Sequence, residues 1–180
     1  MIIRDAIADD FSAILTLNAE SVHFLSPLDA AQLRHLHARA VYHRVIELHG
    51  RVAAFLLAFR EGVHYASPNY QWFAQHYSTF LYIDRVVVDH AARGLGLGIQ
   101  LYDDIRVFAT GTGVPRLTCE FDLDPPNPVS AKFHRRFGFR EVGRQWLDEH
   151  RKQVSLQARD IEACTADSGM IGSRIHGEQA

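Results

Sequence analysis

The sequence predicts a mixed α/β fold in one domain of residues 1–159, followed by a polar, flexible tail over residues 160–180. Apolar residues recur with the two-residue period of strands in some segments and with the 3.6-residue period of helices in others. The two kinds of segment alternate without an internal repeat, and 180 residues can bury a substantial core. The stretch beyond Asp160 is polar, contains glycine and has neither period.

The first third of the chain predicts two helices and three strands. After Asp9, an acidic residue that can cap free amides, apolar residues recur at helical spacing, and a second helical stretch lies near Asp29 to Arg39. His49-Gly50 separates two strand-like runs, and a two-residue connection ending in glycine is typical of a tight hairpin. The run after this turn is apolar on both faces, which predicts a central strand. The expected strands are Ile2–Asp5, Val41–Leu48 and Val52–Phe59.

The segment Glu61–Ser78 interrupts the alternation. It contains Gly62, Pro68 and many aromatic residues. A loop of this length inside a domain tends to be functional or to contain a short helix. Two interpretations stay open, a peripheral hydrophobic cluster and a lid over a substrate.

The second half of the chain returns to alternating strands and helices. A strong strand at Thr79–Val88 precedes a glycine-rich stretch and a helix with one apolar face. Asn127 is suited to cap a later helix, Pro128 to its first position and Gly138 to its end. The remaining strands are expected at Arg116–Phe121, Phe139–Val142 and Gln153–Ala158. The expected architecture therefore has about six to seven strands and about four helices.

Composition and charge exclude several classes of function. A formal net charge of −2 gives no reason to expect nucleic acid, whose binders usually carry a strong positive excess. The start of the chain lacks the features of a secretory signal, and no apolar run approaches the roughly 18 residues of a membrane span. We therefore expect a cytoplasmic protein with no membrane partner. Cys119 and Cys164 form no metal knuckle and the 11 histidines are scattered, so no metal is expected.

The segment Arg93-Gly94-Leu95-Gly96-Leu97-Gly98 follows a strand and opens a helix. A helix start presents unpaired amides and glycine lets the backbone approach an anion closely, so this arrangement is typical of phosphate binding. The dinucleotide motif GxGxxG does not fit, because the third glycine comes one residue early. The ATP/GTP loop does not fit, because no lysine follows. Taken alone, the segment also fits a plain tight turn.

The longer run RVVVDHAARGLGLGIQLYDDI resembles motif A of the GNAT superfamily of acyl-CoA-dependent N-acyltransferases, written Q/R-x-x-G-x-G/A. Arg93, Gly96 and Gly98 occupy the three defining positions. A second run, NPVSAKFHRRFGF, resembles the family's N-x-x-A/S-x-x-F-Y-x-x-x-G-F helix and strand. The resemblance covers Ile2 to roughly Ala158. It implies the GNAT fold, a mixed twisted sheet that is splayed near its middle and flanked by helices.

The resemblance also implies acetyl-CoA as co-substrate and gives binding roles to three groups of residues. Backbone amides of the glycine segment would hold the pyrophosphate: Arg93, Gly94, Leu95, Gly96, Leu97 and Gly98. The exposed backbone of the preceding strand would pair with the pantetheine arm: Val86, Val87 and Val88. The thiol end of the cofactor would meet Asn127 and His134.

Two carboxylates are candidates for the base that amine acylation requires. Glu120 lies on the strand before Asn127, where some family members carry a catalytic Glu, and Asp84 lies where others carry theirs. Strand alternation predicts that Asp84 shares a face with Val86 and Val88. The alternative for each carboxylate is a buried pair with a nearby arginine, Arg85 or Arg116.

His134 departs from the family pattern, which usually has Tyr at this position to protonate the leaving thiolate. An imidazolium could do the same, so His134 is either the acid or a sign that no acid is required. The connection from Glu120 to Asn127 contains Pro125-Pro126 and is about two residues longer than in relatives that use this Glu. That length could displace Glu120 from the reacting centre.

The function that these features predict is N-acetylation of an amine by direct attack on acetyl-CoA. Cys119 adjoins Glu120 but faces the other way, so it is expected in the core and not in a covalent intermediate. The alternatives are a non-catalytic acyl-CoA-binding or sensor module and a nucleotide-binding enzyme. A small metabolite, a peptide N-terminus and a lysine side chain all stay open as acceptors. An edge strand near the C-terminus could pair across a homodimer.

Overall fold

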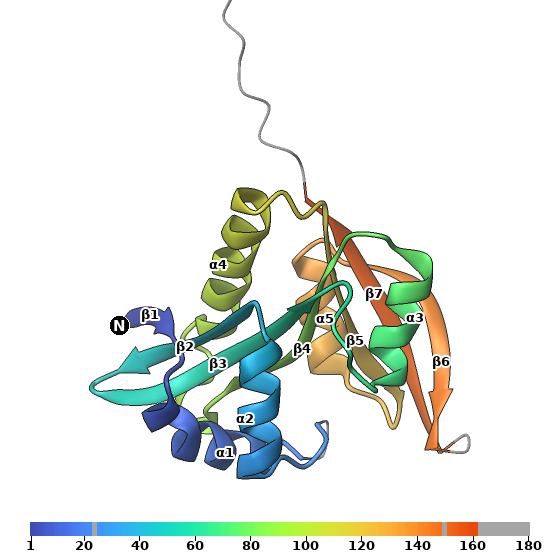
Figure 1. The fold of residues 1–180 in the computed structure, drawn as a ribbon. Helices are drawn as coiled ribbons and strands as arrows, with labels where there is room; N and C mark the ends of the chain where they lie inside the picture. The colour runs from blue at the N-terminus through green and yellow to red at the C-terminus, as the bar shows by residue number, and fades with distance from the viewer. Residues whose placement is uncertain (23–24, 149–150, 162–180) are drawn as a thin grey trace, which may run out of the picture.

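The computed structural model describes residues 1–22, 25–148 and 151–161. They form one seven-stranded sheet in the order β1-β2-β3-β4-β5-β7-β6, with helices on both faces (Figure 1). All neighbouring strands are antiparallel except β4 and β5, which run parallel. The strands are β1 Ile2–Asp5, β2 Tyr42–Leu48, β3 Arg51–Arg60, β4 Leu81–Val88, β5 Arg116–Asp124, β6 Arg140–Leu147 and β7 Lys152–Asp160. Beyond 161, the predicted tail lies outside the described residues.

Local signals in the sequence account for the β2–β3 hairpin. His49 and Gly50 both adopt left-handed backbone angles, with φ of 50° and 74°, which is the geometry that two-residue hairpins favour. The strand after the turn, β3, pairs with β2 on one side and with β4 on the other. Its residues from Ala53 to Phe59 are buried, so the prediction of a central strand is confirmed.

Side chains cap the starts of two helices, at Asp29 and at the predicted Asn127, whereas the cap predicted at Asp9 is not formed, because the first long helix starts after Asp10 without a side-chain cap hydrogen bond. The Asp29 carboxylate accepts a hydrogen bond from the Gln32 amide at 2.7 Å, and Asn127 Oδ1 accepts one from the Ser130 amide at 3.0 Å. A short 3-10 turn, Ala8–Asp10, precedes the first helix. The helices are α1 Phe11–Ala19, α2 Ala30–Arg39, α3 Pro68–His76, α4 Leu97–Gly111 and α5 Pro128–Arg136.

Helix α4 and the pair α1 and α2 cover opposite faces of the sheet (Figure 1). On β2, Ile46 packs with the α4 cluster, while its neighbour Val45 packs with Ile14 and Leu33 of α1 and α2. Adjacent strand residues point to opposite faces, so β2 is apolar on both sides because both sides are covered.

Helix α3 occupies the segment in which the sequence left two interpretations open. Phe73 is fully buried with Phe80 and Tyr82. The Tyr70 hydroxyl accepts a hydrogen bond from the Val63 amide at 2.9 Å and donates one to the Arg60 carbonyl at 2.8 Å. These contacts favour the hydrophobic cluster, since the aromatic rings are part of the core on the α1 and α2 face.

Strands β4 and β5 separate soon after they meet. In the part of the chain that the structure describes, the two strands share the pairs Leu81–Leu117 and Tyr82–Thr118 and no others. Past these pairs β4 continues beside β3 and β5 continues beside β7. The predicted splay near the middle of the sheet is therefore confirmed.

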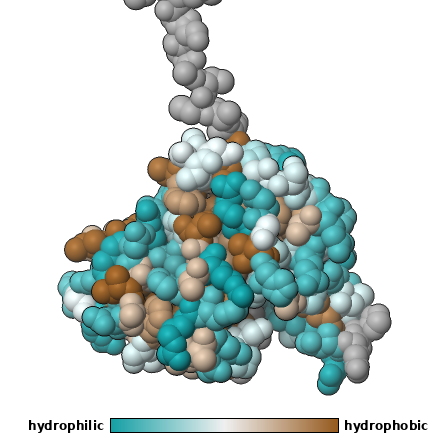
Figure 2. All heavy atoms as spheres, viewed as in Figure 1, coloured by the Kyte–Doolittle hydropathy of each residue, from teal (hydrophilic) through white to brown (hydrophobic). Residues whose placement is uncertain are grey.

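No helix in residues 1–22, 25–148 or 151–161 is long and apolar enough to cross a bilayer. On the face in Figure 2, hydrophilic residues predominate and apolar residues form separate spots.

Replacing Leu101 by Ala should test how much α4 contributes to stability. Leu101 is 0% exposed between α4 and the sheet, so the cavity should lower the free energy of unfolding by about 2–5 kcal/mol. The matched control is Val107→Ala on the same helix, where the side chain is 62% exposed and the change should stay within about 0.5 kcal/mol. Urea denaturation of both variants measures the difference, and equal losses would contradict this packing.

Candidate active site

The glycine segment joins β4 to α4 in a backbone conformation that can bind an anion. Gly94 and Gly96 have φ of 84° and 79°, a left-handed conformation that glycine adopts without strain. Gly96 is the N-cap of α4, and no side chain of the described residues caps that end. The first-turn amides of this 15-residue helix are therefore available to a phosphate.

Gly98 brings the two sequence motifs together. A Cβ built at Gly98 would lie 3.5 Å from the Phe133 ring of α5 and 3.9 Å from Val88 of β4. A larger side chain would press against both neighbours. Glycine at this position thus lets α4, α5 and β4 meet beside the loop.

The backbone of Val86, Val87 and Val88 has one paired edge and one open edge. Val86 pairs with Leu56, and Val88 with Ala54, both on β3. The other edge lies beyond the last β4–β5 pair that the described residues make. An extended ligand could therefore add to β4 as a further strand would.

Glu120 lies on β5 just past the point where β4 and β5 separate. Its Oε1 accepts a hydrogen bond from the Tyr82 hydroxyl at 3.0 Å. Its Oε2 is buried and lacks a well-formed hydrogen bond from the described residues, although the Asn69 amide is close enough to lower the carboxyl pKa. Burial outweighs these contacts and raises the pKa of Glu120 to about 8.

The long connection after Glu120 leaves its register intact. Glu120 pairs with Leu156 of β7, and the regular pairing continues to Asp122. A bulge between Asp122 and Asp124 interrupts the pairing only beyond that point. The additional length before Asn127 is therefore absorbed after the candidate base.

Asp84 occupies the other face from the one that strand alternation predicts. Leu57 pairs with Arg85 and Ala58 with Ile83, so Asp84 is the extra residue of a β-bulge. The bulge resets the alternation, and Asp84 shares the face of Arg85 and not that of Val86 and Val88, which pack with α4. The prediction of a shared face was wrong for this reason.

Asp84 forms the buried ion pair that the sequence allowed as its alternative. One carboxylate oxygen contacts Arg85 Nε at 2.7 Å and the other accepts from the Tyr65 hydroxyl at 2.5 Å. The side chains of Asp84 and Arg85 are 4% and 6% exposed. Arg85 also donates to Asn18 Oδ1 of α1 at 2.9 Å. Arg116, the other arginine expected as a possible partner of these carboxylates, pairs with Asp160 instead.

His134 is enclosed in the core between α4, α5 and β5. Its Nδ1 lies 2.8 Å from the Ser130 carbonyl oxygen, so this nitrogen donates, and Nε2 lies 2.8 Å from the Tyr102 hydroxyl, which donates to it. The ring is 4% exposed and stacks on Phe121. Burial lowers the pKa of His134 to about 4, so the ring is neutral at pH 7 with both nitrogens engaged. Cys119 is also buried, on the α4 face, as expected.

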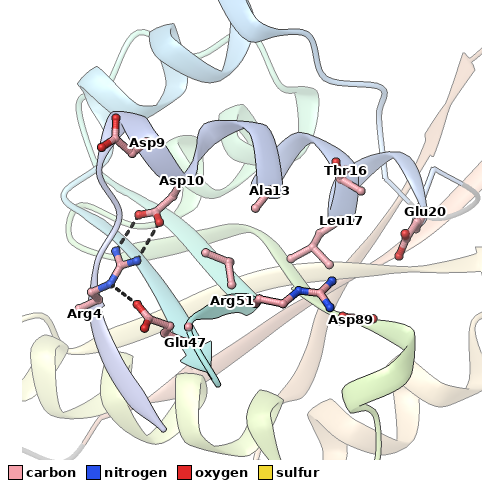
Figure 3. Close-up of a pocket in the computed structure, with 12 residues that line it drawn as sticks. Arg4, Asp9, Asp10, Ala13, Thr16, Leu17, Glu20, Glu47, Arg51 and Asp89 are labelled. Atoms are coloured by element: carbon pink, nitrogen blue, oxygen red, sulfur yellow. Dashed lines mark hydrogen bonds and ion pairs between the residues drawn. The ribbon is translucent and has the colours of Figure 1, made fainter.

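A separate hollow of about 420 Å³ lies beside α1 and the β2–β3 hairpin (Figure 3). Arg4 points into it and pairs with Asp10 at 2.7 Å and with Glu47 at 3.1 Å. The charged groups that line this hollow thus partly neutralise one another. The described residues that line it include none of the predicted site residues.

The sequence model described as Acetyltransferase (GNAT) family matches residues 4–139. This chain belongs to the GNAT acetyltransferase family. The match spans both motifs and the sheet from β1 to β5. A comparison with curated proteins finds no match.

Solved structures share the GNAT fold over nearly their whole length. The ribosomal-protein-S18-alanine N-acetyltransferase of Escherichia coli has a TM-score of 0.69 and 15% identity, covering 92% of this chain and 97% of its own. Ard1 of Thermoplasma volcanium has a TM-score of 0.71 and 15% identity, covering 89% and 97%. An N-acetyltransferase of Staphylococcus aureus Mu50 has a TM-score of 0.66 and 22% identity, covering 89% and 98%. At these identities the likeness shows the fold alone.

Two residues near Glu120, Tyr82 and Asn69, were not among the predicted site residues. Strand alternation by itself places Tyr82 on the face of Val86 and Val88, and only the bulge at Asp84 turns it to the other face, so the sequence could not bring Tyr82 to Glu120. Asn69 carries no sequence signal either, since its position depends on where α3 packs. Within the described ranges no group of three or more His, Cys, Asp or Glu could hold a metal.

Gly96→Ala should lower the stability of the protein and weaken ligand binding at the glycine segment. An alanine in the left-handed conformation costs roughly 1–2 kcal/mol, so we expect a lower free energy of unfolding and weaker binding of acetyl-CoA. Gly111→Ala at the far end of α4 is the control, because it has open space and should leave binding unchanged. Chemical denaturation and calorimetric titration with acetyl-CoA measure the two effects. Unchanged binding in Gly96→Ala would count against the loop.

The buried imidazole of His134 should make the protein less stable as the pH falls. With a folded pKa of about 4 against about 6.5 in the unfolded chain, the unfolded state binds more protons between these values. Lowering the pH from 7 to 5.5 should therefore remove about 1 kcal/mol through this group. In His134→Leu the fall in unfolding free energy over this range should be smaller by that amount. The matched control is His35→Leu, since the His35 ring is exposed. If His35→Leu reduced the loss of unfolding free energy between pH 7 and 5.5 by the same amount, the effect could not be attributed to His134.

Proposed function

We propose that the protein is an N-acetyltransferase that transfers an acetyl group from acetyl-CoA to a primary amine of a small molecule, peptide or protein. The observation that carries the proposal is Glu120. Its carboxyl group is buried where β4 and β5 separate, one oxygen has no well-formed partner, and its pKa of about 8 suits proton transfer near neutral pH.

The residues of the glycine segment fit a CoA-type co-substrate. The uncapped start of α4, reached through left-handed Gly94 and Gly96, supports pyrophosphate binding by the amides of Arg93 to Gly98. The open edge of Val86 to Val88 supports pairing with the pantetheine arm. Asn127, at the start of α5, would face the thiol end.

The proposed reaction is direct attack of the amine on the thioester carbonyl. The new N–C bond forms, the C–S bond breaks, and the excess proton of the amine passes to Glu120, directly or through water. A base is needed most for a lysine-like amine, of which only about 0.04% is neutral at pH 7, whereas about 14% of an α-amine is neutral.

We assign Asp84 and His134 to supporting roles. The Asp84 carboxylate is already held by Arg85 and Tyr65, which leaves Glu120 as the base. His134 is neutral with both nitrogens engaged, which favours the alternative that no acid is required. A thiol with a pKa near 8.5 can leave as the thiolate and take its proton from solvent. The cytoplasmic location and the homodimer stay predictions.

Glu120→Gln should abolish base catalysis while keeping the shape of the side chain. We expect the rate of CoA release with an active amine to fall by about 10²–10⁴-fold at pH 7, because that is the usual contribution of a general base. Binding of acetyl-CoA should be unchanged. The control is Glu141→Gln, an exposed carboxylate on β6.

Two outcomes would contradict the proposal. Turnover by Glu120→Gln at the wild-type rate would remove Glu120 from the mechanism. Thermal stabilisation by acetyl-CoA with no CoA release from small amines, peptide N-termini or lysine peptides would identify a sensor module. A thermal-shift panel that also contains NAD and ATP tests the co-substrate, and stabilisation by either of these in place of acetyl-CoA would overturn it.

A further inference from the structure

Two histidines join helix α2 to strand β2. Nδ1 of His37, in the last turn of α2, lies 2.9 Å from Nδ1 of His43 on β2. Their rings meet edge to face, with centroids 5.1 Å apart. A hydrogen bond between two such ring nitrogens requires that one of them, and not both, carries a hydrogen. The contact between helix and sheet therefore depends on how many protons the pair holds.

His43 is the enclosed member of the pair. It is 7% exposed, and its ring lies edge to face with Phe55 of β3 at 6.3 Å. Its Nε2 is buried and has no hydrogen-bond partner among the described residues. A charged ring would have to bury two N–H groups where only Nδ1 has a partner, and an unpaired buried polar group costs free energy. The surroundings therefore favour a neutral His43.

His37 is the member that can accept a first proton without breaking the bond. It is half-buried and packs edge to face with Phe11 of α1 at 5.1 Å. In the last turn of a helix the macrodipole favours a positive charge. A charged His37 still donates from Nδ1 to a neutral His43. A second added proton charges both rings, places a hydrogen on both Nδ1 atoms and so removes the acceptor.

Charged groups on the neighbouring elements act on His43 in opposite directions. Asp10, just before α1, favours the charged ring, whereas Arg85 of β4 opposes it. Both are already held in ion pairs of 2.7 Å. Burial, followed by the charge on His37, outweighs Asp10 and lowers the pKa of His43 to about 4.

We propose that His37 and His43 form a pH-sensitive latch, which holds the end of α2 on the sheet while the pair carries at most one added proton and releases it when both rings are charged. Helix α2 contributes Leu33 and Leu36 to the core, so release of its last turn loosens this packing. The latch is closed above the ordinary histidine pKa of about 6.5 and opens as the pH falls toward that of the buried ring. This inference does not depend on the proposed acetyl transfer.

NMR can detect the shared proton directly. In protein labelled with ¹⁵N-histidine, an N–H···N hydrogen bond transmits a scalar coupling between its two nitrogens. Wild type should show this coupling between Nδ1 of His37 and Nδ1 of His43 at pH 7 and should lose it as the pH approaches 4. Absence of the coupling in the folded protein at pH 7, or its persistence when both rings are charged, would overturn the inference.

Amide hydrogen exchange measures the release of α2. With a pKa of His43 of about 4 in the closed form and about 6.5 once the ring is exposed, the protection of amides in the last turn of α2 should fall about twentyfold between pH 7 and pH 5. The comparison uses protection factors, which already correct for the intrinsic effect of pH on exchange.

Two substitutions to Asn separate the latch from general acid damage. His43→Asn removes the buried titrating ring, and its amide can both donate to and accept from His37, so the contact should survive at every pH. Protection of its α2 amides should therefore stay nearly constant between pH 7 and pH 5. His35→Asn is the matched control at an exposed histidine of the same helix and should keep the wild-type fall. An equally steep fall in His43→Asn, or its loss in His35→Asn, would exclude the latch.

His37→Leu provides a test that does not require replacing the buried residue. Leucine cannot form the hydrogen bond at any pH, so the last turn of α2 should exchange faster than in wild type already at pH 7. Circular dichroism checks that each variant is folded. Wild-type exchange of α2 in folded His37→Leu would show that the histidine pair does not hold the helix.

Discussion

Strands β4 and β5 run side by side for two residue pairs and then part, and the arrangement of both halves of the site depends on this separation. Parallel strands normally continue their ladder, because unpaired backbone groups cost free energy when they are buried. Here each strand keeps its other neighbour, β3 for β4 and β7 for β5, so the sheet remains one unit while its middle opens. The opening leaves a backbone edge on the side of the glycine segment and brings the Glu120 carboxyl group to the start of the gap.

The two carboxylates near the opening differ because their neighbours differ. Asp84 is buried with Arg85, and the pair compensates the loss of water around both charges. Burial raises the pKa of Glu120, and the hydrogen bond from the neutral Tyr82 hydroxyl offsets this only in part. A carboxyl group that is held in place but lacks a cation can exchange a proton near neutral pH. Geometry and electrostatics therefore both support Glu120, and not Asp84, as the proposed base.

Features that depend on neighbours in sequence could be predicted, and features that depend on distant contacts could not. The helix start near Asp29, the cap at Asn127 and the turn at His49-Gly50 depend on groups within a few residues of one another. The face of Asp84 was predicted wrongly, because the bulge in β4 is defined by its register with β3. The packing of Trp72 on Gly143 could not be foreseen, since it joins α3 to a strand far along the chain.

The sequence by itself determined the family, the glycine segment and the two candidate bases, because these depend on residue types at short spacing. The tertiary structure decided which candidate keeps a carboxyl group without a cation, and it placed His134 inside the core with both nitrogens engaged. The physical reason is that burial and hydrogen-bond partners set the protonation of a side chain, and both come from segments that meet only when the chain has folded.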